Sequence, residues 1–148
     1  MEPDISEVIR VSELTDEEQL SLARQATAFL TKFRWCAGVK ESFLAFDIGS
    51  PIGVFLFRIE PRLIGIDDTL WVIVGHCPPA YIVCQDARDW AEAIQGYIRE
   101  MQRWVDAIRS GGSVVGLIPV NVSPTIEHAE MLSKRLSFLQ DLIDDKLF

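Results

Sequence analysis

One short stretch of the sequence places a potential nucleophile beside a potential base. The stretch VGHCPPAY, residues 74–81, holds His76, Cys77 and two prolines between two apolar runs. A cysteine thiolate activated by a histidine can carry out covalent catalysis. However, neighbouring side chains in an extended chain point to opposite faces, so His76 is badly placed to accept the proton of Cys77. A cysteine enzyme would therefore need His128 as its base, and no sequence motif joins His128 to Cys77.

The same stretch also has a purely structural interpretation. Proline φ is locked at about −65°, whereas a two-residue primed hairpin turn needs positive φ at one or both central positions. The flanking strands must then end before Pro78 and Pro79, and Gly75 can supply an unusual backbone angle. A cis peptide bond before either proline is a variant of this arrangement. We predict that residues 75–80 form a rigid reversal.

The other residues capable of chemistry do not form a site motif. The two histidines share no local element, and the chain has no CxxC or HExxH pattern, so we expect no metal site. Gly111-Gly112-Ser113 lacks the lysine of a P-loop, and no GxGxxG pattern follows a strand, so we expect no cofactor. The acids at 16–18, 67–68 and 144–145 are typical of solvated helix ends and loops. Asp47 is interpreted as the last residue of a strand.

The net charge of the chain argues against two classes of binding partner. The 148 residues include 14 Lys+Arg and 22 Asp+Glu, which gives a formal net charge of −8. Such a balance repels phosphate backbones and anionic lipids, so we expect neither nucleic acid nor a membrane as partner. The basic pairs Lys32 with Arg34 and Lys134 with Arg135 are short, and we interpret them as solvated helix faces.

The cellular compartment is inferred from the first residues and from the cysteines. The segment MEPDISEVIRVSEL has acids where a signal peptide would carry a basic region. The three cysteines are an odd number at irregular positions, which does not suit a disulfide framework. The apolar runs are far shorter than the roughly 20 residues that cross a bilayer. These features predict a cytoplasmic protein, and we expect a bacterial one.

Hydrophobic periodicity predicts an α+β fold in a single domain over residues 1–148. The spacing of Thr15 and Glu18 suits a capping box that begins a first helix, which extends to about Arg34 and is broken by Gly38. After an extension over 1–14 and this helix, we expect strands at 42–48, 52–59, 70–74 and 81–84, a helix over 86–110, an extended segment at 114–122 and a helix over 124–145. Short connections imply an antiparallel meander of about four to five strands, packed with three amphipathic helices.

The predicted hairpin is apolar on both faces. Val54 and Leu56 alternate with phenylalanines along one strand, and Leu44 and Phe46 lie on one side of its neighbour. Such strands need helices on both faces or a second subunit. We predict a homodimer, because a closed two-fold pair is the commonest assembly, with these four residues as interface candidates.

The order of helix, strand meander, helix, strand and helix loosely resembles that of the small acidic dimeric chaperones of bacterial secretion systems. Acidic immunity proteins that neutralise toxins share the size and charge of the chain. These likenesses imply protein binding and transfer no site residue. We expect a non-enzymatic protein-binding or adaptor domain. The alternative is a small enzyme with its site near the 75–80 loop, using Cys77 and a histidine.

Overall fold

The chain forms two compact units in a computed structural model, Met1–Ile94 (unit 1) and Gln95–Phe148 (unit 2). The structure describes every residue except 1–2, 4–7, 48–51, 66 and 148, and of 146 and 147 it describes the backbone alone. Unit 1 contains the sheet and the first helix, and unit 2 contains most of the second helix and all of the third. The single domain expected over residues 1–148 stays a prediction.

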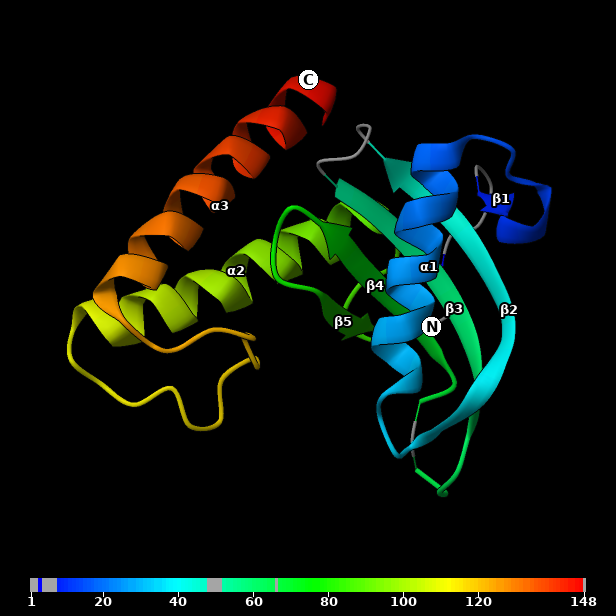
Figure 1. The fold of residues 1–148 in the computed structure, drawn as a ribbon, viewed down its shortest axis with the longest axis horizontal. Helices are drawn as coiled ribbons and strands as arrows, with labels where there is room; N and C mark the ends of the chain where they lie inside the picture. The colour runs from blue at the N-terminus through cyan, green and yellow to red at the C-terminus, as the bar shows by residue number, and fades with distance from the viewer. Residues whose placement is uncertain (1–2, 4–7, 48–51, 66, 148) are drawn as a thin grey trace. The chain divides into compact units, whose positions relative to one another are not determined.

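Unit 1 is built on a five-stranded antiparallel sheet, in which the order of the strands follows their order in the chain (Figure 1). The strands are β1 (Ile9–Arg10), β2 (Cys36–Asp47), β3 (Ile52–Pro61), β4 (Thr69–Gly75) and β5 (Ala80–Val83). Together with three α-helices, this meander confirms the predicted α+β fold.

The first helix, α1 (Glu17–Thr31), begins one residue later than its sequence signal indicated. Asp16, and not Thr15, is the N-cap, because its carboxylate accepts a hydrogen bond of 3.0 Å from the backbone N–H of Gln19. A single-turn 3-10 helix, η1 (Val11–Glu13), precedes it. The strand β1, which pairs with Leu44 and Phe43 of β2, lies in the segment that we expected to be an extension.

The predicted end of the first helix at Arg34 is wrong. The helix ends at Thr31, and Gly38, which was expected to break it, lies inside β2. The pairing of β2 with β3 is irregular between Cys36 and Gly38, and an isolated glycine in a strand is typical of such a bulge. Pairing with β3 therefore makes β2 begin at Cys36. Such long-range pairing cannot be predicted from a local helical pattern.

One face of the sheet packs against α1, which lies along it in Figure 1. The spacing of Leu22, Ala26 and Leu30 puts their side chains on one helical face. The core that they share with the strands includes Leu44, Phe55, Phe57, Ile59, Leu70, Val72 and Val74. Alternation along β3 then directs Val54 and Leu56 to the opposite face.

The opposite face is buried as well. Val54, Leu56 and Trp71 have no exposed surface. Within unit 1, the segment that leads into the second helix contacts this face, because the indole N–H of Trp71 donates a hydrogen bond of 2.9 Å to the carbonyl of Ala87. Both faces of β3 are therefore covered, as its apolar residues predict.

The second and third helices begin later than predicted. The second helix, α2, is Trp90–Arg109 instead of 86–110, because Asp89 accepts a hydrogen bond of 2.9 Å from the backbone N–H of Glu92 and so acts as the cap in place of Asp86. The third helix, α3, is Ile126–Leu147 instead of 124–145. Thr125 is its capping residue, since its hydroxyl accepts from the backbone N–H of His128.

The segment 114–122 is not extended as predicted. It belongs to an irregular loop between α2 and α3, with no strand assigned in it. Gly116 has a φ of 83°, and Pro119 lacks the N–H that a sheet ladder needs. Gly116 and Pro119 therefore interrupt this apolar run, which forms a loop instead of a strand.

Candidate functional site

The 75–80 loop is a short reversal between β4 and β5. Ile73 pairs with Ala80, so the chain turns within six residues, and Gly75 at a φ of 136° begins the turn. No cis peptide bond occurs in the described residues, which places Pro78 and Pro79 in trans. This backbone geometry confirms the predicted reversal, and its rigidity stays a prediction.

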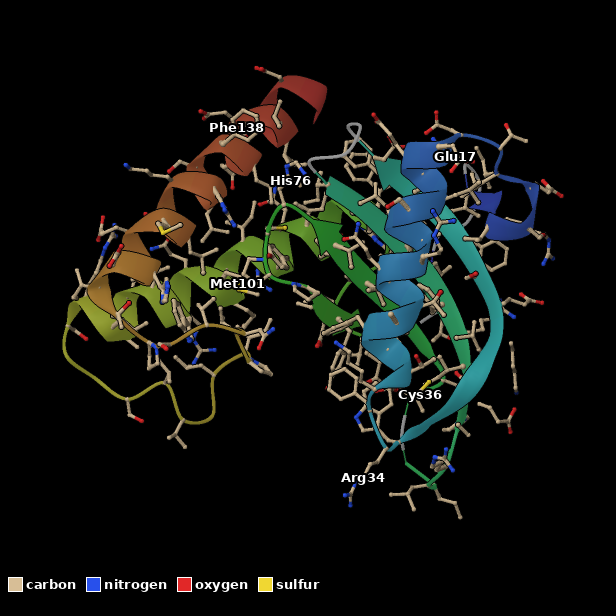
Figure 2. All side chains as sticks on the ribbon, in the orientation of Figure 1. Glu17, Arg34, Cys36, His76, Met101 and Phe138 are labelled. Carbon is tan, nitrogen blue, oxygen red and sulfur yellow. The ribbon has the colours of Figure 1, made fainter. Side chains whose placement is uncertain are left out.

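The candidate catalytic residues are His76 and Cys77 in this loop and His128 in α3. His76 is exposed, and Figure 2 shows it at the rim of unit 1. Cys77 is half-buried. His128 belongs to unit 2, so the pairing of Cys77 with His128 joins residues of different units and stays a prediction.

His128 has a local structural partner. Its Nδ1 lies 2.8 Å from the carbonyl oxygen of Ser123, so Nδ1 carries the proton and donates it to that oxygen. This bond ties the first turn of α3 to the loop before it. The described residues contain no group of three or more histidine, cysteine, aspartate or glutamate side chains that could hold a metal ion.

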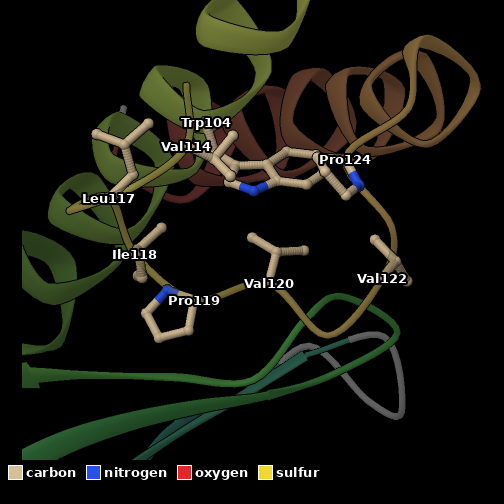
Figure 3. A pocket seen from close by; sticks show the side chains of 8 residues that line it. All are labelled: Trp104, Val114, Leu117, Ile118, Pro119, Val120, Val122 and Pro124. Atoms are coloured by element: carbon tan, nitrogen blue, oxygen red, sulfur yellow. The ribbon is translucent and has the colours of Figure 1, made fainter. Parts of the chain in front are cut away.

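A pocket of about 360 Å³ lies within unit 2 and is lined entirely by apolar residues. Trp104 of α2 forms one wall and is 2% exposed. The loop between α2 and α3 supplies the other wall, with Val114, Leu117, Ile118, Pro119, Val120, Val122 and Pro124. Figure 3 shows the indole ring facing Val120 across the pocket.

Glycines and backbone hydrogen bonds define the turns of the loop that lines this pocket. Gly111, with a φ of 76°, ends α2, and the N–H of Gly112 donates a bond of 2.7 Å to the carbonyl of Ala107. Further on, the N–H of Leu117 donates to the carbonyl of Val114, which closes a turn beside Gly116. Turns and prolines shape this loop so that seven of its apolar residues line the pocket opposite Trp104, while Val115 points to solvent.

An ion pair joins the two ends of the loop. The guanidinium of Arg109, at the end of α2, donates hydrogen bonds of 2.7 and 3.0 Å to the two carboxylate oxygens of Glu130, and a third of 3.1 Å to Ser133. Hydrogen bonding to Arg109 lowers the pKa of Glu130 and raises that of Arg109. This bidentate contact fixes the start of α3 beside the end of α2.

The four interface candidates lie in unit 1. Val54 and Leu56 are fully buried, and Leu44 is 4% exposed in the core under α1. Phe46 is half-buried and stacks on Trp90 with a ring-centroid distance of 3.9 Å and an interplanar angle of 3°. The structure contains a single chain, so the homodimer stays a prediction.

Sequence reasoning did not find the pocket, because it interpreted the residues at 114–122 as a strand. The available signal was the interruption of this apolar run by Gly116 and Pro119. An apolar loop that cannot join a sheet must cover another apolar surface or remain exposed. Comparisons with protein-family models, with curated proteins and with solved structures find no significant match to the chain.

Proposed function

We propose that the chain is a non-enzymatic protein-binding domain that takes an apolar side chain of a partner protein into the pocket of unit 2. The observation that carries this proposal is the composition of the pocket, since all eight lining residues are apolar. Sites for small metabolites combine apolar walls with a few polar groups that orient the ligand. A pocket whose only polar side-chain group is the indole N–H of Trp104 suits an anchor that the backbone of a larger partner positions.

The size of the pocket fits such an anchor. An apolar cavity of about 150 Å³ is large enough to bind benzene. The pocket of about 360 Å³ therefore has room for a bulky aliphatic or aromatic side chain and part of its neighbours. The ion pair of Arg109 with Glu130 joins the two helices that flank the loop.

Peptide selection followed by NMR tests the proposal. Peptides are selected from a displayed library on the purified protein and titrated while the indole N–H signals are recorded, with Trp104→Phe identifying the signal of Trp104. We expect the Trp104 signal to shift and that of Trp71, which is buried in unit 1, to stay in place. Peptides that shift neither signal, or Trp71 alone, would contradict the proposal.

Matched variants locate the binding site. Leu117→Glu and Val120→Glu place a charge in the pocket and should weaken binding at least tenfold, roughly the cost of burying an unpaired charge. Val115→Glu is the control, because Val115 belongs to the same loop, is 88% exposed and does not line the pocket. Equal losses in all three variants would show that the charge disturbs the loop as a whole.

We further propose that the protein acts in the cytoplasm as a homodimer. Exposed apolar side chains on α3 support association, since Met131 is 50% and Phe138 56% exposed. Light scattering should give about twice the chain mass of 16.7 kDa, and Phe138→Glu should return it to one chain. A single-chain mass at every concentration rejects the dimer. Leu56→Glu is unsuitable as a probe, because Leu56 is fully buried in one chain.

A further inference from the structure

We propose that one end of unit 1 docks on an anionic lipid surface through the loop between β3 and β4. This loop carries Leu63 and Ile64, which are 65% and 106% exposed. No helix in the described part of the chain is long and apolar enough to cross a bilayer. The inference therefore concerns attachment at the surface, and it is independent of the pocket in unit 2.

The fold brings cations to this loop from two segments. Lys32 and Arg34 follow the end of α1, and Arg62 directly precedes Leu63. The backbone N–H of Arg62 donates a bond of 3.0 Å to the carbonyl of Trp35, which holds the two segments together. All three cations are exposed, and no described carboxylate lies within ion-pair distance of them.

An aromatic cluster includes Phe33 and Trp35, which flank Arg34 in the chain. Trp35 stacks on Phe33 at a centroid distance of 4.9 Å, and Tyr81 contacts both rings edge-on at 5.2 and 5.4 Å. Trp35 and Tyr81 pack against the core of unit 1 and stay partly exposed. The cluster therefore keeps part of its aromatic surface accessible to solvent.

The order of these groups matches the layers of a membrane surface. Leu63 and Ile64 are the most exposed of these groups, the three cations are exposed in the two segments that the bond from Arg62 to Trp35 joins, and Trp35 and Tyr81 are only partly exposed. Aliphatic groups enter the boundary of the acyl chains, arginine and lysine pair with anionic headgroups, and tryptophan and tyrosine favour the interface between them. A protein partner would need a matching hollow around Ile64, whereas a fluid bilayer accommodates a fully exposed tip.

The acidic balance of the chain does not prevent this contact, because the charges are unevenly placed. Asp16, Glu17 and Glu18 begin α1, whereas Lys32 and Arg34 follow its end, and Figure 2 shows Glu17 and Arg34 at opposite ends of the helix. A helix of 15 residues is about 22 Å long, which is more than two screening lengths of about 8 Å at physiological salt.

The nearer acids leave an excess of positive charge at the tip. Glu60 is neutralised by Lys40 at 3.2 Å. Asp67 and Asp68 are exposed and lie on the return of the loop toward β4, where Asp68 accepts a hydrogen bond of 3.1 Å from Thr69. Among the described residues of these two segments, three cations without an ion pair therefore accompany two carboxylates, and Arg62 directly precedes Leu63.

Vesicle flotation with the full chain tests this inference. The protein should float with phosphatidylcholine vesicles that contain phosphatidylserine, stay behind with phosphatidylcholine alone, and be released by added salt. Leu63→Ser with Ile64→Ser should lower the partition constant roughly tenfold or more, because both side chains lose their transfer into the apolar layer. Arg34→Glu with Arg62→Glu should remove the preference for phosphatidylserine.

Two controls make the result decisive. Val115→Ser removes another highly exposed aliphatic side chain, in unit 2, and should leave flotation unchanged. All of the replaced residues are exposed, so circular dichroism should show the same fold in every variant. The inference is overturned if the wild-type protein does not float with anionic vesicles, or if the Leu63–Ile64 variant floats equally well. Binding of a thymidine oligonucleotide or polyglutamate, without binding of vesicles, would also overturn it in favour of that ligand.

Discussion

Trp71→Phe should destabilise unit 1 by about 3 kcal/mol through two separate losses. The indole N–H donates a hydrogen bond of 2.9 Å to the carbonyl of Ala87, and both residues are buried. Removal of the donor leaves that carbonyl without a partner, which costs about 1–3 kcal/mol. Phenylalanine also has two ring carbons fewer than tryptophan, and each carbon contributes about 0.8 kcal/mol of burial.

Trp90→Phe is the matched control. Trp90 stacks on Phe46 and is half-buried, and within the described part of the chain its indole N–H has no hydrogen-bond partner. Phenylalanine keeps a stacked ring, so we expect a loss of about 1 kcal/mol. Urea unfolding followed by circular dichroism measures both variants, with unchanged m-values as the condition for comparison. Equal losses for the two variants would refute the role assigned to the hydrogen bond from Trp71.

Three further predictions concern caps, charge and backbone. Asp16→Ala should cost about 1 kcal/mol in urea unfolding, and Thr15→Ala much less, because only Asp16 caps α1. The hydrogen bonds from Arg109 lower the pKa of Glu130 below its ordinary value of 4.5. The stabilisation of the folded state by this ion pair is therefore present above pH 4.5 and is lost as the pH falls through the folded-state pKa of Glu130. Glu130→Gln should make the free energy of unfolding less dependent on pH below 4.5. Gly111→Ala should lower stability by about 1 kcal/mol, because φ at this position is 76°.

The sequence predicted the elements of the sheet better than their ends. Alternating apolar residues in 52–59 identify β3, and a turn-rich segment on each side bounds it. The helix starts were displaced because neighbouring residues compete as caps, as Asp16 does with Thr15 and Asp89 with Asp86. Which side chain accepts the bond depends on the entering backbone, and the helix pattern does not contain that information.

The pocket of unit 2 and the surface around Leu63 and Ile64 were not predicted from the sequence, for two different reasons. The pocket depends on a loop whose apolar residues resemble those of a strand, so local pattern led to the wrong element. The group of cations beside Leu63 and Ile64 depends on a contact between two segments that are far apart in the chain. Lys32 with Arg34 was interpreted as a solvated helix face, and only the pairing of β2 with β3 adds Arg62 to them.

The two proposals predict opposite outcomes for two sets of variants. Leu63 and Ile64 belong to unit 1, whereas the residues of the pocket belong to unit 2. Leu63→Ser with Ile64→Ser should therefore lower the partition constant on vesicles about tenfold or more and keep peptide binding, whereas Leu117→Glu should weaken peptide binding about tenfold or more and keep flotation. Because the two sets share no residue, a variant that combines them should lose both activities. If either set alone removed both activities, the loss would come from unfolding, and the urea midpoint of that variant would have to fall with it.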